Sequence, residues 1–227
     1  VLAGGLGTRL GALTAQLPKP MVDIAGKPFL CYLLDYLARQ GIKEVILAVG
    51  YQAEKIIAYF GKQYKSLSLS YSHETQPLGT GGAILQALTL FKLNQAFIIN
   101  GDSLFLADLK KLWEFHLDKQ TELSLALSLQ ENSARYGKVI LDRQQKIIKF
   151  TEKGEAGPGL INGGIYLLEF AVFNNFTKGQ KFSFEEEALL SLVNQQQVHG
   201  LIDSSYFIDI GLPETYAQAQ KDFLTLF

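Results

Sequence analysis

The sequence predicts an α/β fold, a three-layer α/β/α sandwich with a mixed, mostly parallel central sheet. Through the first hundred residues, short apolar runs alternate with amphipathic segments, which is the order that gives a sheet with helices on both faces. After Lys119 strands follow one another with few helical residues between them, which predicts antiparallel pairing. No linker, repeat or low-complexity stretch interrupts the chain, so we expect a single domain over 1–227.

Each element has its own signal. Pro28 opens a helix that Gly41 ends, and the helix over 108–119 carries Leu109, Leu112, Trp113 and Leu117 on one side. Ser183 and Glu186 have the spacing of a capping box before an apolar run over 188–193. The other expected helices cover 53–60, 81–91 and 213–227. The expected strands cover 1–3, 44–50, 67–71, 96–100, 123–129, 139–141, 147–150, 164–168, 198–202 and 206–210.

The composition is that of a soluble globular protein. Of the 227 residues 48% are apolar and 19% are charged, and the net charge is −1, which argues against nucleic acid as a partner. We find no signal peptide and no membrane-length apolar run, so a cytoplasmic protein without a membrane partner is expected. The single cysteine, Cys31, excludes an internal disulfide and is expected to be buried. Because the chain begins on a strand residue, a few residues are expected to be missing before Val1.

The first twenty residues indicate a phosphate site. Gly4, Gly5 and Gly7 leave the turn after the first strand without side chains, so that backbone N–H groups can approach an anion. Arg9 and Lys19 place two positive charges beside that backbone. An ordinary glycine-rich turn would explain the glycines alone. A P-loop is excluded by spacing, and a dinucleotide fingerprint is excluded because Leu10 stands where its third glycine belongs.

Two later strands each deliver an aspartate near a glycine. Asp102 follows the strand over 96–100, and Asp209 ends the strand over 206–210. Ligands of open α/β sheets bind at the carboxyl ends of strands, and Mg²⁺ prefers one or two carboxylates together with phosphate oxygens. We therefore expect Asp102 and Asp209 to share one Mg²⁺ ion. A turn or helix-capping role would explain Asp102 equally well if it stood alone.

Two further stretches have the chemistry to bind the rest of a nucleotide and a sugar. The side-chain-poor loop at 74–83 would give flat access to a base, whose edge the amide of Gln76 could pair with. Glu152 and Asn162 could bind hydroxyls and Lys153 a phosphate, which suits a sugar phosphate. Taken alone, the first stretch could be a plain helix start and the second an exposed pair of charges.

Together these motifs resemble the sugar-1-phosphate nucleotidyltransferase family. The signature G-G-x-G-T-R-L stands at 4–10 and P-K-P at 18–20, and other family motifs follow in order. These are 77–83, 100–102, 152–153, 162–164 and 207–211. Within the family the chain is most similar to guanylyltransferases that use D-glycero-α-D-manno-heptose 1-phosphate or mannose 1-phosphate, with 135–137, 160–164 and 181–185 adding to the likeness.

The resemblance implies a Rossmann-like nucleotide-diphospho-sugar transferase fold, with a nucleotide-binding half at 1–110 and a sugar-phosphate-binding half at 111–227. It implies that a sugar 1-phosphate attacks the α-phosphorus of a nucleoside triphosphate, expected to be GTP, and that pyrophosphate leaves. The product is an NDP-sugar for bacterial surface polysaccharide such as lipopolysaccharide. Arg9, Lys19 and Asp102 would be catalytic. The implied nucleotide-binding residues are Leu2, Ala3, Gly4, Gly5, Gly7, Thr8, Arg9, Lys19, Gln76, Pro77, Leu78, Gly79 and Gly101. The implied sugar-phosphate residues are Gly137, Glu152, Lys153 and Asn162.

Other functions compete with this interpretation. A uridylyl- or thymidylyltransferase for another sugar 1-phosphate would carry the same phosphate motifs. A non-catalytic paralogue that binds a sugar nucleotide and regulates a partner would be expected to have lost Arg9, Lys19 or Asp102, all of which are present. The sequence leaves the oligomeric state open, a homo-oligomer included.

Overall fold

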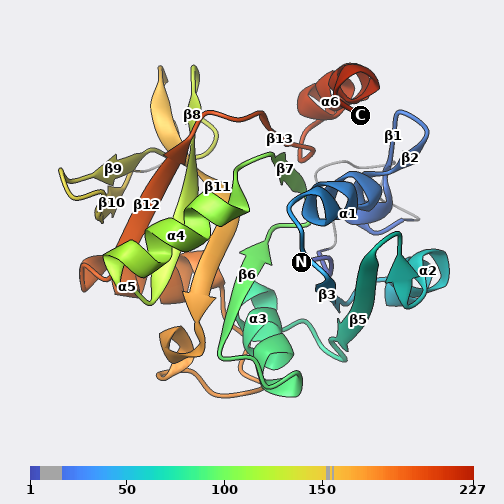
Figure 1. Cartoon of the computed structure of the whole chain (residues 1–227), viewed down its shortest axis with the longest axis horizontal. Coiled ribbons are helices and arrows are strands. Elements are labelled where there is room, and N and C mark those ends of the chain that lie inside the picture. The colour runs from blue at the N-terminus through green and yellow to red at the C-terminus, as the bar shows by residue number, and fades with distance from the viewer. Residues whose placement is uncertain (6–16, 152–153, 155) are drawn as a thin grey trace. The chain divides into compact units, whose positions relative to one another are not determined.

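The computed structural model describes residues 1–5, 17–151, 154 and 156–227, and these form two compact units (Figure 1). The first unit consists of 1–77, 100–104 and 207–227, and the second of 78–99 and 105–206. The α/β class with a mixed sheet is confirmed, since both units combine helices with parallel and antiparallel strands. The single domain and its division near residue 110 stay predictions.

The first unit is built on parallel strands. In this unit β3 (Glu44–Val49) pairs in parallel with β5 (Leu67–His73), and the short β4 (Gln63–Tyr64) adds to β5 antiparallel. Leu2 pairs in parallel with Ala48 of β3 on one side and with Asn100 on the other. The remaining elements are η2 (Lys19–Met21), β1 (Asp23–Ile24), β2 (Lys27–Pro28), α1 (Phe29–Arg39), α2 (Ala53–Phe60), β13 (Phe207–Asp209) and α6 (Pro213–Leu226).

The core of the first unit is apolar and aromatic. Helix α1 buries nearly its whole length, including Cys31 as expected, and Tyr32 packs edge-on against Phe223 of α6 with ring centroids 4.6 Å apart. Asp35 of α1 is buried as well, and two ammonium groups lie within ion-pair distance of its carboxylate, those of Lys27 and Lys65. Desolvation of Asp35 is outweighed by these two partners, so its pKa lies below the ordinary value.

The second unit has a four-stranded sheet in the order β12-β8-β11-β6. Its strands β12 (Val198–Asp203) and β8 (Leu123–Gln130) are parallel, whereas β11 (Gly159–Glu169) is antiparallel to both β8 and β6 (Gln95–Ile99). The other elements are α3 (Gly79–Leu90), β9 (Val139–Leu141), β10 (Ile147–Phe150), η3 (Phe170–Phe173), the π-helical η4 (Phe184–Leu189) and α5 (Leu190–Asn194). Strand β7 (Ser103–Phe105), whose first two residues belong to the first unit, pairs with β13 of the first unit.

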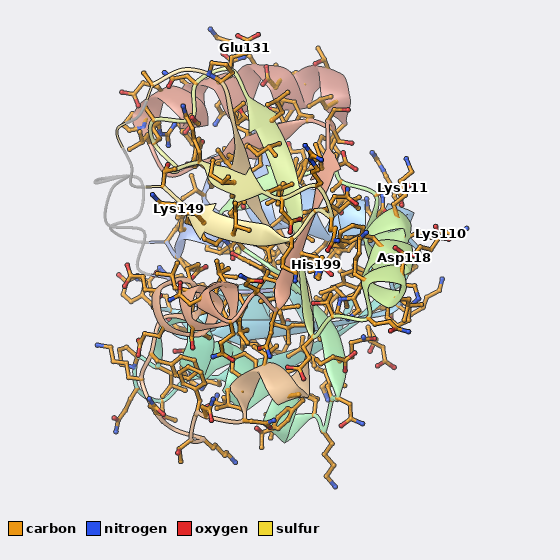
Figure 2. All side chains as sticks on the ribbon, turned by 90° about the vertical axis from the view of Figure 1, so that its left-hand side faces the viewer. Lys110, Lys111, Asp118, Glu131, Lys149 and His199 are labelled. Atoms are coloured by element: carbon orange, nitrogen blue, oxygen red, sulfur yellow. The ribbon has the colours of Figure 1, made fainter. Side chains whose placement is uncertain are left out.

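Helix α4 (Leu109–Lys119) packs on one face of this sheet (Figure 1). The Asp108 carboxylate caps it, accepting a hydrogen bond from the N–H of Lys111. Figure 2 shows Lys110 and Lys111 projecting outward from the helix. The predicted inner side is wrong at Trp113 and Leu117, which are 40% and 55% exposed. His116 is buried instead, because its ring hydrogen-bonds Ser124 on the sheet (2.9 Å) and so satisfies one polar atom there.

The expected capping box at Ser183 forms with one change. The hydroxyl of Ser183 accepts from the N–H of Glu186, as expected, but the N–H of Ser183 donates to the carboxylate of Glu187 rather than to that of Glu186. The wider π-helical turn of η4 accounts for the shift by one residue. Throughout the described part of the chain, every helix is too short or too polar to cross a membrane.

Candidate active site

In the first unit four chemically distinctive residues follow the ends of neighbouring parallel strands. Gly4 follows the strand segment at Leu2, Gly50 follows β3, Glu74 follows β5, and Asp102 follows Asn100. Because parallel strands end at the same edge of a sheet, these positions share one edge, where open α/β sheets bind ligands. Residues that are far apart in the sequence therefore lie at the same edge of the sheet.

Glycine is required where these strand ends approach one another. A Cβ atom on Gly101 would collide with the carbonyl oxygen of Leu2, which accepts the N–H of Gly101. A Cβ on Gly4 would lie 2.8 Å from Oε1 of Glu74 and 3.2 Å from the backbone nitrogen of Gly50. A Cβ on Gly5 would meet none of the described atoms within 4 Å. With respect to the described residues, the backbone of Gly5 is therefore uncovered, as expected of a ligand-binding turn.

Lys19 is held by two prolines and an aspartate. Pro18 is extended and Pro20 lies in the first turn of η2, so the backbone on both sides of Lys19 has a fixed φ. The Lys19 ammonium lies 2.6 Å from Oδ2 of Asp102, and its side chain is only 14% exposed. The P-K-P motif therefore fixes one cation beside the strand-end carboxylate.

Asp209 joins this pair. A Cβ on Gly211 would lie 2.8 Å from Oδ1 of Asp209 and 3.3 Å from Nζ of Lys19, so both groups border the same point. The N–H of Ile210 donates to the carbonyl of Asp102, which fixes the end of β13 beside Asp102. Asp102 and Asp209 therefore both lie close to Lys19 in the first unit.

The donor set suits a hard divalent cation. Asp102 and Asp209 offer carboxylate oxygens, and the Asp102 side chain is 46% exposed and so open to further ligands. Within the described ranges no group of three or more His, Cys, Asp or Glu side chains could hold a metal ion. Two carboxylates leave the remaining positions to water or phosphate oxygens, the arrangement that Mg²⁺ favours.

In the second unit the glycines at the start of α3 accommodate protein rather than open space. Gly79 has φ +71°, and a Cβ there or on Gly81 would collide with Phe182, while one on Gly82 would lie 2.5 Å from the carbonyl of Gln180. Backbone hydrogen bonds join Gly81 to Phe182 and Phe182 to Leu78. These contacts keep the start of α3 in place against the segment at Phe182.

Asn162 lies at a bulge in β11. The register with β8 shifts between Asn162 and Ile165, so Gly163 and Gly164 are extra residues on this strand. Gly164 has φ +73°, and a Cβ on Gly163 would collide with the ring of Phe105. The Asn162 amide oxygen accepts the N–H of Gly164 (3.0 Å), which orients the side chain.

Gly137 precedes a residue that is hydrogen-bonded to Thr151, directly after β10. Gly137 has φ +75°, and the next residue, Lys138, exchanges hydrogen bonds with Thr151. The N–H of Gly154 donates to the carbonyl of Ala134 (2.7 Å). Lys138 and Ala134 therefore lie beside Thr151 and Gly154, respectively.

The other predicted residues fall into two groups. Gln76 and Pro77 are exposed, Leu78 is 8% exposed, and Ala3 is fully buried, so only the backbone of Ala3 could reach a ligand. The others lie outside the described residues, and their roles stay predictions: Gly7, Thr8, Arg9, Glu152 and Lys153.

The structure adds two residues to which the sequence analysis gave no role. Glu74 lies against Gly4 and Gly50, and Glu185 accepts a hydrogen bond from Thr80 directly after Gly79. Both residues lie inside stretches that the sequence analysis names, 74–83 and 181–185. Only the parallel pairing of β5 with β3 shows that Glu74, rather than Gln76, lies directly at the end of the strand.

Known proteins share this architecture and sequence. A D-glycero-alpha-D-manno-heptose 1-phosphate guanylyltransferase of Aneurinibacillus thermoaerophilus is 46% identical over 222 residues, covering 98% of this chain and 96% of that relative. A protein of the same name from Campylobacter jejuni is 46% identical over 216 residues, covering 95% of each chain. The crystal structure of HddC from Yersinia pseudotuberculosis complexed with GMP-PN matches with a TM-score of 0.87 and 38% identity, covering 98% of this chain and 97% of that one.

A model of the nucleotidyl transferase family matches residues 1–225, nearly the whole chain. The match includes the glycine-rich start, the Lys19–Asp102 pair and the strand end at Asp209. The family resemblance inferred from the motifs is thereby confirmed, and the chain belongs to the nucleotidyl transferase family, an enzyme of that class.

Proposed function

We propose that this enzyme transfers a guanylyl group from GTP to a manno-configured sugar 1-phosphate, with D-glycero-α-D-manno-heptose 1-phosphate as the preferred acceptor. The observation that carries the proposal is that Lys19, Asp102 and Asp209 lie close together in the first unit. The choice of GTP and heptose is supported by the two guanylyltransferases that are 46% identical over almost their full length.

The chemistry needs charge stabilisation rather than a general base. The attacking sugar phosphate is already an anion, so the barrier comes from repulsion between polyanions and from charge that develops as pyrophosphate leaves. Lys19 is preorganised for this role, because its ammonium is largely buried and Asp102 holds it in place. Arg9 would bind the departing pyrophosphate, and Lys153 would anchor the sugar phosphate. When bound at Asp102 and Asp209, Mg²⁺ would neutralise phosphate charge and orient the phosphates for in-line transfer.

Glu74 supports guanine as the base. A guanine edge carries two adjacent donors, N1–H and the N2 amino group, and a carboxylate accepts from both at once. Oε1 of Glu74 lies beside the Cα of Gly4, in the turn expected to hold the nucleoside. Uracil and thymine each present one N–H between two carbonyl oxygens, which a carboxylate would repel. Glu74 therefore favours GTP over UTP and dTTP.

The sugar end is assigned to the second unit. Asn162, at the bulge of β11, and Gly137, with its positive φ, would bind hydroxyls. Glu152 is proposed to bind the same sugar. The amide orientation at Asn162 leaves one N–H and one oxygen lone pair for a diol.

The test is a matrix of nucleoside triphosphates against sugar 1-phosphates, read by pyrophosphate release. GTP, ATP, UTP and dTTP are each paired with manno-heptose, mannose, glucose and N-acetylglucosamine 1-phosphates. We expect GTP with manno-heptose 1-phosphate to give the highest kcat/KM. A better rate for UTP or dTTP with a gluco-configured sugar would overturn the proposal. The Lys19→Ala variant gives the background rate.

A further inference from the structure

We propose that Glu185 is a positioning residue that holds Asn162 in its sugar-binding orientation through Tyr166, and that Thr80 fixes the Glu185 carboxylate. This inference rests on the proposed function, because it concerns the sugar end of the same reaction. All four residues lie in the second unit.

The first step is the asparagine. Its amide nitrogen donates to the hydroxyl of Tyr166 (2.8 Å), and its oxygen accepts from the N–H of Gly164 (3.0 Å). A backbone N–H can only donate, so the second bond settles which end of the amide is oxygen. With both ends tied to β11, the side chain of Asn162 has one defined orientation before a ligand arrives.

The second step is the tyrosine. Tyr166 is fully buried, and its ring packs edge-on against Phe184 at 5.0 Å between centroids. Its hydroxyl accepts from Asn162 and donates to Oε1 of Glu185 (3.4 Å). An acceptor for that proton is needed, because a hydroxyl that donated toward Asn162 would face another N–H. Glu185 therefore determines which way the Tyr166 hydroxyl points.

The third step fixes the carboxylate. The hydroxyl of Thr80 donates to Oε2 of Glu185 (2.8 Å) and accepts the N–H of Phe184 (2.8 Å). Thr80 directly follows Gly79 in the predicted nucleotide loop, and Glu185 lies on the π-helical η4. Hydrogen bonds thus connect the start of α3 to the sugar-binding asparagine, and short π-helical segments are frequent at functional sites.

The test compares variants in steady-state kinetics with GTP and the best sugar 1-phosphate. Glu185→Gln keeps the shape but leaves one acceptor oxygen for two hydroxyl donors, and Tyr166→Phe removes the hydroxyl while keeping the ring. We expect each to raise KM for the sugar 1-phosphate about tenfold, the size of one hydrogen bond to a charged group, with KM for GTP changed less than about twofold. The KM of the double variant for the sugar 1-phosphate should be about the same as that of either single variant, because both substitutions interrupt the same series of hydrogen bonds.

Two controls separate positioning from folding. Glu186→Gln removes the same charge from the exposed neighbouring residue and should leave every constant unchanged. Thr80→Ser keeps the hydroxyl and should retain the wild-type KM, whereas Thr80→Val should raise it. Thermal unfolding of each variant, and calorimetric binding of the sugar 1-phosphate, are measured alongside.

The outcomes are distinct. A Glu185→Gln enzyme with normal KM for the sugar, or effects of Glu185→Gln and Tyr166→Phe that multiply, would overturn the inference while leaving the proposed function intact. A wild-type protein that neither releases pyrophosphate from GTP nor binds a sugar 1-phosphate would instead overturn the proposed function.

Discussion

Glycines of the predicted motifs meet different surroundings in the two units. In the first unit Gly4, Gly5 and Gly211 leave space beside charged groups or toward open surroundings. In the second unit the corresponding space is filled by the protein's own rings, Phe182 against Gly81 and Phe105 against Gly163. The same glycine-rich signal in a sequence therefore marks two different physical requirements, room for a ligand and room for a side chain.

The two units also differ in the polar side chains that they bring together. In the first unit the Lys19 ammonium pairs with Asp102 and, with Asp209, borders Gly211, a set suited to moving phosphate charge. The second unit uses hydroxyls, an amide and one half-buried carboxylate, a set suited to selecting and orienting a polyol. Substitutions in the charged cluster of the first unit should consequently affect kcat, whereas substitutions in the second unit should affect KM or stability.

The largest effect is expected for the charged cluster. Lys19→Ala and Asp102→Ala should each lower kcat by about 10²–10³-fold, as when a preorganised electrostatic group is deleted from an active site. Thermal unfolding of both variants is measured as the control for folding. Near-normal pyrophosphate release by either variant would show that the cluster is not the centre of the reaction.

Gly211→Ala tests the same cluster without removing a charge. The added Cβ would lie 2.8 Å from Oδ1 of Asp209 and 3.3 Å from Nζ of Lys19, so the arrangement of these two groups must shift. A displacement of this kind should cost about ten- to a hundredfold in kcat. Thermal unfolding serves as the control, and a loss of stability that matched the loss of rate would assign Gly211 a structural role instead.

Glu74→Gln should change base selectivity more than rate. An amide offers one acceptor and one donor where the carboxylate offers two acceptors, so a guanine edge loses one hydrogen bond. We expect the ratio of kcat/KM for GTP over UTP to fall about tenfold. Competition assays with both nucleotides measure this ratio directly. An unchanged ratio would remove Glu74 from base recognition and return attention to Gln76.

In the second unit Gly81→Ala should reduce stability rather than chemistry. The new methyl group would collide with the Phe182 ring, which stacks on Phe176 at 4.1 Å and has little freedom to move. Overpacking of this kind costs about 1–3 kcal/mol, of which the better helix propensity of alanine recovers up to about 1 kcal/mol. Chemical denaturation measures the difference, and a fully stable variant would contradict the contrast between the two units.

Much of this arrangement could be predicted from local sequence. The bounds of α2 agree with the expected helix at 53–60, because helical periodicity and flanking glycines are local signals. The strand-end aspartates were also predictable, since an apolar run that ends in Gly and Asp indicates the edge of a sheet.

Contacts between distant segments were not predictable in the same way. The position of Phe182 against Gly81 depends on a segment about a hundred residues away, and no local pattern encodes it. His116 illustrates the same limit, because its burial depends on Ser124 of the sheet rather than on its place in the helical pattern. The position of the Glu74 carboxylate likewise depends on the pairing of β5 with β3, which no local pattern encodes.

His116 gives the smallest expected effect and contrasts with the charged cluster. Its pKa lies below the ordinary 6.5 because burial disfavours the charged ring, and the opposing attraction of Glu169 only partly offsets this. The folded protein therefore binds fewer protons at this group than the unfolded chain does, so its contribution to stability is present above about pH 6.5 and is lost as the pH falls below it. The fall in unfolding temperature between pH 7 and pH 5 should be shallower in His116→Asn than in wild type. Equal slopes would mean that this neutral histidine, unlike the ion pair at Lys19, plays no part in the response of the protein to pH.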